Sequence, residues 1–483
     1  MGTVDATVTY EPPVPIELRA TSPRRRVERS AVTAATFARH LGPVALAKAL
    51  NRPIDSQDVG VRLRRAFDEL GSTYLKFGQL IGSSPGAFGA AVADEFRGCL
   101  DTGPAVAFED VRRAVERTTG TTLDKTFATF KTEALASASI AVVHQAVLHD
   151  GREVAVKVLR PGIAEQVAID LDVMEPLFKR LALQGVPIAG PLYRFLRGFR
   201  TQVAEELDLR NEARTMVHFA GLVADGGLDR IVIPDPIPEL SGTDVLVMTF
   251  LDGVAIDDLA AIEQLGHDPA PLVQELLRCW FLTGIRFGMF HGDIHAGNLM
   301  LLRDGRIGMV DWGIVGRLDG PTHRLFRRFV EAVLGDATAW PEIVAFLSEM
   351  APFAGDEADG TKPREIPTEA KEEIEGLLTR PFGQVDLTGA FSGPGNGPIG
   401  NGRRSEPRTK AEKRERKARL KDLRKRVIGT GFADSGFAQA NFMLFKQLLY
   451  FERYGKLYLA DSALMGDREY LQHVLDTSPV PEG

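Results

Sequence analysis

Two aspartates and an asparagine stand in close order in the middle of the chain, in residues 291–298 and in Asp311-Trp312-Gly313. Asp293 and Asn298 are five residues apart, the spacing of the catalytic acid and the metal-binding amide in kinase loops. Asp311 follows in the place of the aspartate that grips Mg²⁺ in a DFG-type motif. The pattern predicts phosphoryl transfer from a nucleotide, with Asp293 beside the acceptor and with Asn298 and Asp311 as metal ligands.

The residues between Asn298 and Asp311 predict the element that positions this set. Residues 299–310 are apolar at both ends and are interrupted by Arg303-Asp304-Gly305-Arg306, which is typical of a short hairpin. Such a hairpin would carry one metal ligand at each end. Any one of the three residues alone would be assigned to an ordinary polar loop, but three in this order favour a nucleotide site.

A lysine earlier in the chain is a candidate for contact with phosphate. Lys157 belongs to a hairpin predicted from residues 140–148 and 154–159. A lysine at a strand edge is usually only solvated. Here a glutamate-bearing helix follows, predicted at about residues 193–222, and the acidic set comes later, in the chain order of protein kinases. Glu212 on that helix is the natural ion-pair partner, so Lys157, Glu212 and Asp293 are the candidate catalytic residues.

Two further segments are candidates for nucleotide contact. A loop of small residues precedes the hairpin, where an ordinary kinase has a glycine-rich loop; its candidate residues are Ala136, Ser137, Ala138 and Ser139. Alanine does not readily adopt positive φ, so this loop should be stiffer than one built of glycine. Backbone groups of Thr249 and Leu251 are assigned to adenine by position alone. Without the flanking motifs, these segments would read as a small-residue turn and a strand end.

Two motifs that ordinary kinases lack occur in the same chain: Lys76-Phe77-Gly78-Gln79, on an amphipathic helix predicted within residues 61–100, and Glu206-Leu207-Asp208. With the alanine-rich loop and the His-Gly-Asp loop, they make residues 60–350 resemble the UbiB family of atypical kinases. The resemblance implies an α+β, protein-kinase-like fold of two lobes, with ATP or ADP and Mg²⁺ as cofactors. It also implies a role near isoprenoid or quinone lipids at a membrane surface.

The resemblance further implies regulatory roles for Lys76, Gln79, Glu206 and Asp208, and ion pairs of Lys76 with Glu206 and of Lys157 with Glu212. On one continuous helix, Glu206 and Glu212 would project about 120° apart and could serve different lysines. Glu205 shares the face of Glu212 and competes for either lysine. The departures from the family pattern are Val142, Trp312 and Thr249 in place of Gln, Phe and Glu, and Ser84-Pro85-Gly86 after the KxGQ motif.

Composition sets wider limits on the fold and function. A chain of 483 residues, 44% hydrophobic and 25% charged, is expected to form two or three globular units. The net charge of -7 argues against a nucleic-acid binder. Its two cysteines, Cys99 and Cys279, have no zinc-site spacing and fit a reduced cytoplasmic protein. No run of apolar residues is long enough to predict a membrane span, so any membrane contact, on the inner face, should be peripheral.

Six segments are predicted along the chain. The segments are an N-terminal extension that is poorly ordered to about residue 30 and then helical (1–58), a KxGQ helical segment (59–133), an N-lobe (134–252), a C-lobe (253–388), a flexible and then basic linker (389–428) and a C-terminal helical extension (429–483).

The linker contains a strongly basic run. Residues 403–426 hold thirteen Lys or Arg against four acidic residues, which is compatible with an anionic lipid contact or with a solvated helix.

Three functions are compatible with these residues. The leading one is an ATP-binding, Mg²⁺-dependent atypical kinase or ATPase that supports quinone, isoprenoid or other lipid metabolism, with lipid, a membrane surface and lipid-metabolism proteins as partners. The second is a small-molecule phosphotransferase of the aminoglycoside or choline kinase type, which shares the His-Gly-Asp loop. The third is a pseudokinase scaffold that binds nucleotide without turnover. The KxGQ and ExD motifs favour the first. In the family that the chain resembles, the KxGQ segment folds over the site where a protein substrate would lie, and a small-molecule kinase has no use for a helix covering its acceptor site.

Overall fold

The computed structural model describes residues 10–19, 22–50, 52–53, 55–82, 90–96, 106–183, 189–318, 320–343, 368–385 and 436–480. The linker at 389–428, Cys99 and Ser84-Pro85-Gly86 lie outside these residues. Within the described residues helices predominate, and the strands form three separate sheets, the largest of five strands. The α+β class predicted from the sequence is therefore confirmed.

The five-stranded sheet is antiparallel, with the order β1-β3-β4-β6 and with β2 paired to β3. Its strands are β1 (Phe127–Phe130), β2 (Ala136–Ser137), β3 (Ala141–Leu148), β4 (Glu153–Leu159) and β6 (Val245–Thr249). β3 and β4 form the predicted hairpin, whose turn contains Gly151 at φ +87°, a value that glycine adopts without strain. Helix α6 (Phe108–Thr119), predicted at 108–118, shares a small core with one face of the sheet through Val115, Val156 and Val247.

The five-stranded sheet belongs to the first lobe, the predicted N-lobe. The second lobe, the predicted C-lobe, is built around α12 (Ala270–Phe287), which is apolar and buried over most of its length. One small sheet has the order β5 (Ile231–Val232), β10 (Ile307–Met309), β9 (Leu299–Leu302) and β7 (Gly253–Ala255). Another pairs β8 (Met289–His291) with β11 (Val315–Arg317). β9 and β10 are the hairpin predicted between Asn298 and Asp311, so the two predicted metal ligands flank it.

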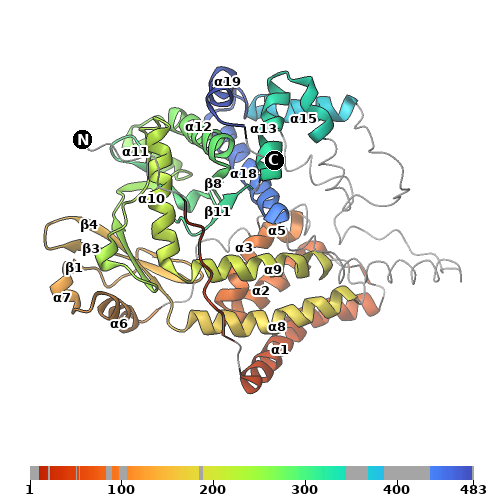
Figure 1. Cartoon of the computed structure of the whole chain (residues 1–483). Coiled ribbons are helices and arrows are strands. Elements are labelled where there is room, and N and C mark those ends of the chain that lie inside the picture. Colours follow the sequence, from red (N-terminus) through yellow and green to blue (C-terminus); the bar gives the residue numbers. More distant parts are fainter. Residues whose placement is uncertain are drawn as a thin grey trace, which may run out of the picture.

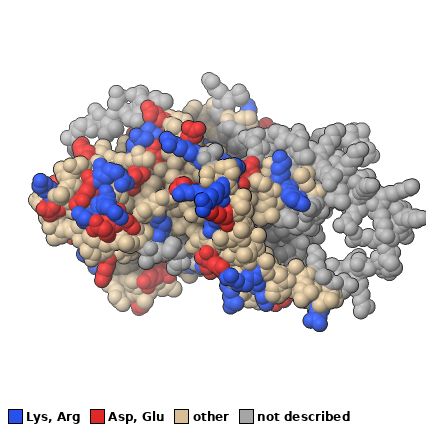
Figure 2. Space-filling model, turned by 90° about the horizontal axis from the view of Figure 1, so that it is seen from below, with Lys and Arg blue, Asp and Glu red and all other residues tan. Residues whose placement is uncertain are grey.

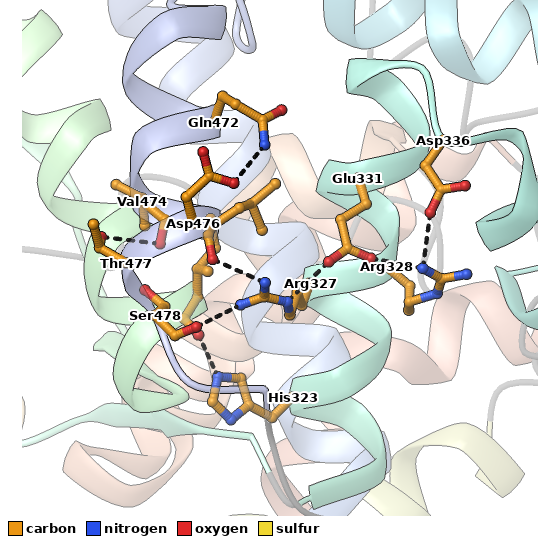
Figure 3. A network of polar contacts seen from close by, with 12 residues as sticks. His323, Arg327, Arg328, Glu331, Asp336, Gln472, Val474, Asp476, Thr477 and Ser478 are labelled. Carbon is orange, nitrogen blue, oxygen red and sulfur yellow. Dashed lines mark hydrogen bonds and ion pairs between the residues drawn. The ribbon is translucent and has the colours of Figure 1, made fainter.

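Two C-terminal helices pack on the second lobe, α18 (Gly436–Tyr458) and α19 (Arg468–Thr477), as the blue ribbons beside α12 and α13 (Gly320–Leu334) show in Figure 1. Arg327 of α13 fixes the end of α19, because its guanidinium donates to the carbonyl groups of Leu475 (2.9 Å) and Ser478 (3.2 Å) (Figure 3). Arg278 of α12 pairs with Asp467 at the start of α19 (2.7 Å). Both ends of α19 are thus tied to the lobe.

The helices before the sheet lie beside the sheet of the first lobe and below the second lobe in the view of Figure 1. They are α1 (Pro23–Ala49), α2 (Ser56–Leu70), α3 (Ser72–Gly82) and α5 (Ala90–Phe96), which pack with α8 (Ile163–Leu183) and α9 (Ala189–Glu206). The sequence predicted a single amphipathic helix within residues 61–100, and this prediction was wrong, because the segment forms α2, α3 and α5 as separate helices. It breaks at Gly71, whose φ of +93° lies outside the helical range. Across the break, the Phe67 ring packs edge-on against Tyr74, with centroids 5.6 Å apart, and tilted against Phe77, with centroids 6.5 Å apart.

The N-terminal residues differ from the expectation of poor order up to about residue 30. α1 already begins at Pro23, and residues 10–19 lie along α9 and α10 (Leu209–Asp225). Ile16 N donates to Ala204 O (3.0 Å), and the Asn211 amide exchanges two hydrogen bonds with the backbone of Val14. A side-chain amide offers the same kinds of donor and acceptor as a peptide group. The Asn211 side chain therefore pairs with the backbone of Val14 as a neighbouring β-strand would.

The long helix predicted at about 193–222 is two helices, because α9 ends at Glu206 and α10 begins at Leu209. Asp208 lies between them and caps α10, accepting a hydrogen bond from Arg210 N (3.1 Å). Aspartate is a strong N-cap and a weak residue inside a helix, so the local capping preference prevails over the apolar period. The predicted 120° angle between Glu206 and Glu212 assumed one helix and does not apply.

Three smaller differences concern strand and helix ends. Residues 127–130 form β1, although the segment 59–133 was expected to be helical. Of the strand predicted at 231–237, only β5 forms, because Pro234 and Pro236 lack the N–H that a sheet ladder needs. The helix predicted at 322–347 ends at Leu334, where Gly335 has φ +119°.

The surface and the helix compositions bear on membrane contact. Figure 2 shows acidic and basic side chains intermixed over the described residues of the face it presents, rather than an extended patch of one sign. Of the helices that the structure describes, none has the length and apolar character needed to cross a bilayer.

Candidate active site

Lys157 joins the two lobes at the centre of the candidate site. It extends from β4, and its Nζ lies 2.9 and 2.8 Å from the two carboxylate oxygens of Glu212 in the first turn of α10. The same ammonium lies 3.1 Å from Asp311 Oδ1. Burial acts to lower the pKa of Lys157, but the carboxylates of Asp311 and Glu212 outweigh it and raise that pKa. The ion pair of Lys157 with Glu212 is thus present.

Asp311 lies two residues after the end of the hairpin strand β10. With a φ of +59°, it is the one non-glycine residue in the described part of the chain with positive φ. Aspartate tolerates this conformation better than most residues, and strained backbone clusters at functional sites. Burial would raise the pKa of Asp311, yet the ammonium groups of Lys157 and Lys76 hold it below its usual range. The carboxylate is therefore ionised at neutral pH.

Asn298 lies next to Asp311 across the same hairpin, because Val310 N donates to Asn298 O (2.9 Å). Its side-chain Nδ2 donates to Asp293 O (2.9 Å), which fixes the orientation of the amide. The structure thus brings together three of the residues singled out from the sequence, Asp293, Asn298 and Asp311. Asp293 and Asn298 lie on the β8–β9 connection, whereas Asp311 lies on the β10–β11 connection.

His291 supports this loop from within the core, a role that the sequence analysis missed. Asp293 N donates to His291 Nδ1 (3.0 Å), and His291 Nε2 lies 3.3 Å from Val310 O. The ring therefore bridges the segments that carry Asp293 and Asp311. Burial lowers the pKa of His291 to about 4, so the ring is neutral at physiological pH.

Asp293 has a partner that motif spacing did not reveal. Lys446 of α18 places its Nζ 2.7 Å from Asp293 Oδ1, and the two side chains are 11% and 16% exposed. Burial would raise the pKa of Asp293, but Lys446 outweighs it and the pKa is lowered. Because Lys446 comes from a distant helix, only tertiary structure could have identified it.

Lys76 of α3 pairs with Glu206 at the end of α9, with Nζ 2.6 Å from Oε2. This is the pairing implied by the resemblance. The pair lies beside Asp311, since a Cβ built on Gly313 would be 3.3 Å from Asp311 Oδ1 and 3.5 Å from Glu206 Cγ. Gln79 lies one turn further along α3.

Glu205 and Asp208 do not join the lysines. Glu205 pairs with Arg317 of β11 (2.9 Å), so its expected competition for Lys76 or Lys157 was wrong. The break between α9 and α10 turns Glu205 to another partner. Asp208 caps α10 and pairs with Arg210 (2.7 Å), so its contribution is to the helix start that positions Glu212.

The alanine-rich loop is held by a residue that the sequence analysis did not name, Arg160. Its guanidinium donates to Ala138 O (2.7 Å from Nη2 and 3.1 Å from Nε) and to Ser137 Oγ (2.9 Å). Ala138 N also donates to Ala141 O (2.9 Å), which closes a tight turn. Ala136 and Ser137 pair with β3, and Ser139 is buried. These contacts agree with the stiffness expected of this loop.

Thr249 and Leu251 were predicted to contact adenine through their backbone groups, and one of these groups is already hydrogen-bonded within the protein. The Thr249 N–H donates to Asp235 O (2.9 Å), and the Thr249 hydroxyl accepts from Asp235 N (2.9 Å). Thr249 can therefore offer its carbonyl group but not its N–H. Leu251 lies just beyond β6, before β7.

The donor set fits a magnesium ion that is shared with a nucleotide. No group of three or more His, Cys, Asp or Glu side chains in the described residues could hold a metal by itself. Mg²⁺ usually keeps several waters and binds through one or two carboxylates together with substrate phosphates. The ionised Asp311 and the oriented amide of Asn298 match that mode of binding.

Comparisons with known proteins give a family match. A model described as the ABC1 atypical kinase-like domain matches residues 99–342. This range includes the candidate residues from Ala136 to Asp311 but neither Lys76 nor Lys446. The match confirms the predicted kinase-like fold class.

Several curated proteins are similar to the chain. An uncharacterized protein of Mycobacterium tuberculosis is 40% identical over 279 residues, which cover 58% of this chain and 57% of the relative. An uncharacterized chloroplastic aarF domain-containing protein kinase of Arabidopsis thaliana is 34% identical, over 56% of this chain and 51% of the relative. A probable protein kinase UbiB of Cellvibrio japonicus is 33% identical, over 54% and 48%. The chain thus spans about half the length of the curated relatives it matches.

Two solved structures are also similar. The complex of Rv3197 with erythromycin from Mycobacterium tuberculosis is 25% identical, with a TM-score of 0.38, and covers 56% of this chain and 76% of that chain. The Rio2 kinase complex with ADP, Mg²⁺ and phosphoaspartate from Chaetomium thermophilum is 12% identical, with a TM-score of 0.27, and covers 75% of this chain and 84% of that chain.

Proposed function

We propose that this chain, which belongs to the ABC1 atypical kinase-like family, binds ATP with Mg²⁺ and acts as an atypical kinase or ATPase of the UbiB type. One observation carries the proposal: Lys157 Nζ lies within 3.1 Å of both Glu212 and Asp311, which belong to different lobes. An ammonium clamped by one carboxylate beside a second, metal-binding one is the arrangement that orients polyphosphate in kinases.

Each residue then has a distinct role. Lys157 contacts the phosphates and Glu212 holds it in place, while Asn298 and Asp311 hold Mg²⁺. When bound, the metal neutralises negative charge on the phosphates. Asp293 lies beside the acceptor and takes its proton. Residues 136–139, the Thr249 carbonyl and Leu251 surround the nucleotide.

Lys76 and Glu206 are proposed to regulate this site. Their ion pair is nearly buried and adjoins Asp311 and Gly313, so it adds an ammonium close to the proposed metal ligands. Gln79 and Asp208 support it by position, on α3 and at the start of α10 respectively. The arrangement couples α3 to the metal site.

A role in quinone, isoprenoid or other lipid metabolism, at the surface of a membrane, completes the proposal. It rests on the resemblance to the UbiB family described in the sequence analysis, a name that two of the similar proteins carry as probable protein kinases. Phosphate release measured with and without anionic liposomes tests this part separately. Equal rates in both conditions would remove the membrane surface from the proposal.

The nucleotide site is tested by thermal unfolding of the full chain with Mg²⁺-ATP. Ligand at about 100 times its Kd should stabilise the wild type by about 2.7 kcal/mol, whereas Asp311→Asn should respond weakly or not at all. Asp304→Asn, in the turn of the same hairpin, is the matched control and should respond as the wild type does. Equal responses of the wild type and Asp311→Asn would contradict the assigned metal site. Rapid phosphorylation of amino alcohols or aminoglycosides would instead favour a small-molecule phosphotransferase.

A further inference from the structure

Lys446 stands at the candidate active site although it lies outside the family-matched residues 99–342. Its Nζ is 2.7 Å from Asp293 Oδ1, and both side chains are largely shielded from solvent. The role given to Asp293 above depends on how its carboxylate is oriented. The residue that holds this carboxylate therefore belongs to the functional description of the site.

The helix that carries Lys446 is anchored along its length. Tyr454 donates from its hydroxyl to Ile294 O (2.7 Å), directly beside Asp293, and Tyr458 donates to Ile256 O. The Phe451 ring packs edge-on against Trp280 of α12, with centroids 5.3 Å apart. The position of Lys446 is thus built into the lobe, unlike that of an exposed lysine that meets a carboxylate by chance.

The catalytic loop cannot supply this cation from the residue before the aspartate. A Cβ at Gly292 would lie 2.6 Å from Ile314 Cγ2 and 2.9 Å from Ile314 O, so no larger side chain fits there. Gly292 N also donates to Ile314 O (2.9 Å), which keeps the two segments close. Residues 291–298 contain no Lys or Arg. The positive charge next to Asp293 comes from α18 instead.

We propose that Lys446 is a positioning residue for phosphoryl transfer, which holds the Asp293 carboxylate toward the acceptor. This inference rests on the proposed function. In the step it supports, the acceptor oxygen bonds to the γ-phosphorus and the bond from that phosphorus to the β,γ-bridging oxygen breaks. ADP leaves with the bonding electrons, and the acceptor proton passes to Asp293. Lys446 touches neither the phosphorus nor the acceptor and acts through Asp293.

Steady-state phosphate release by the full chain tests this role with three variants. Lys446→Met, which keeps the side-chain length without the charge, should lower kcat by about 10- to 100-fold. The KM for ATP should change by less than about threefold, because nucleotide binding does not involve Asp293. Lys446→Arg should restore most of kcat. Arg453→Met is the matched control: it removes the ion pair of α18 with Asp257 and should leave both constants unchanged.

A double-mutant cycle with Asp293→Asn separates the possible failures. If Lys446 acts through Asp293, the double variant should be no slower than Asp293→Asn alone. Thermal midpoints of the wild type, the two single variants and the double variant measure the energy of the ion pair without turnover. The effects of the two substitutions on the midpoint should not add.

Four results would overturn the inference: an unchanged kcat in Lys446→Met, a matching loss in Arg453→Met, additive kinetic effects, or a wild type that binds nucleotide without releasing phosphate. A wild type that shows no response to Mg²⁺-ATP would instead remove the proposed function, and the positioning role with it.

Discussion

Lys76 Nζ lies 2.6 Å from Glu206 Oε2, and the two side chains are only 9% and 8% exposed. Burial raises the pKa of Glu206, while Lys76 acts in the opposite direction. The same ammonium lowers the pKa of Asp311, so its field reaches the proposed metal ligand. The pair therefore connects α3 electrostatically to the metal site.

Replacing Lys76 and replacing Glu206 should change the affinity for Mg²⁺ in opposite directions. Lys76→Met removes a positive charge near Asp311 and should lower the Mg²⁺ concentration needed for ADP binding, on the order of tenfold. Glu206→Gln keeps the ammonium without its counter-charge and should raise that concentration. Titration of Mg²⁺ at fixed ADP, followed by calorimetry, measures both. Shifts of the same sign would show that the pair acts through packing instead of charge.

Removing Glu212 should destabilise the whole chain. Glu212→Ala leaves the buried Lys157 with a single carboxylate and deprives Trp312 N of its acceptor (3.3 Å). Breaking a buried ion pair from one side costs about 3–5 kcal/mol. Chemical denaturation measures the free energy of unfolding. Asp150→Asn, in the exposed pair with Arg152, is the control and should unfold as the wild type does. A loss in Glu212→Ala as small as in the control would argue against a buried clamp.

The features that were predicted correctly from the residues had mostly local signals. The β3–β4 and β9–β10 hairpins follow from turn residues between apolar runs, and the catalytic-loop spacing predicted that Asp293, Asn298 and Asp311 would meet. The family resemblance supplied the pairing of Lys76 with Glu206, which spacing alone could not.

The remaining contacts depend on packing between elements that are distant in the chain. Lys446 reaches Asp293 only because α18 docks on α12, and Arg160 meets Ala138 only because β4 ends beside the loop. The break at Asp208 had a local signal, since aspartate favours N-caps, but the apolar period on either side favoured one helix. A capping test at each aspartate would have found it.

Arg160 should control nucleotide affinity through the alanine-rich loop. Arg160→Met removes the donors to Ala138 O and Ser137 Oγ, so the loop is no longer held in one conformation before nucleotide binds. Binding must then order it. That entropic cost should weaken ADP binding by about tenfold. Arg152→Met, at the exposed end of the same hairpin, should not change the affinity. Isothermal calorimetry gives the Kd for both variants, and equal values would contradict the role given to Arg160.

His291 should make the chain less stable in mild acid. Its folded-state pKa of about 4 lies below the ordinary value of 6.5, so the unfolded state binds a proton first as the pH falls. The contribution of His291 is complete above pH 6.5 and should be lost progressively toward pH 4, by about 3 kcal/mol in total. His291→Asn lacks the titrating ring. Its free energy of unfolding, measured by denaturant titration, should fall less over this window, and a parallel decline in both proteins would exclude His291 as the cause.

A crystal structure with ADP and Mn²⁺ in place of Mg²⁺ tests the proposed nucleotide site most directly. Anomalous scattering locates the manganese without reference to the protein, and the oxygen ligands of an octahedral Mg²⁺ site lie about 2 Å from the metal. The proposal predicts a manganese peak at this distance from Asp311 and Asn298 oxygens, with Lys157 Nζ in contact with a phosphate oxygen. Nucleotide bound in another cavity, or manganese away from both side chains, would contradict it.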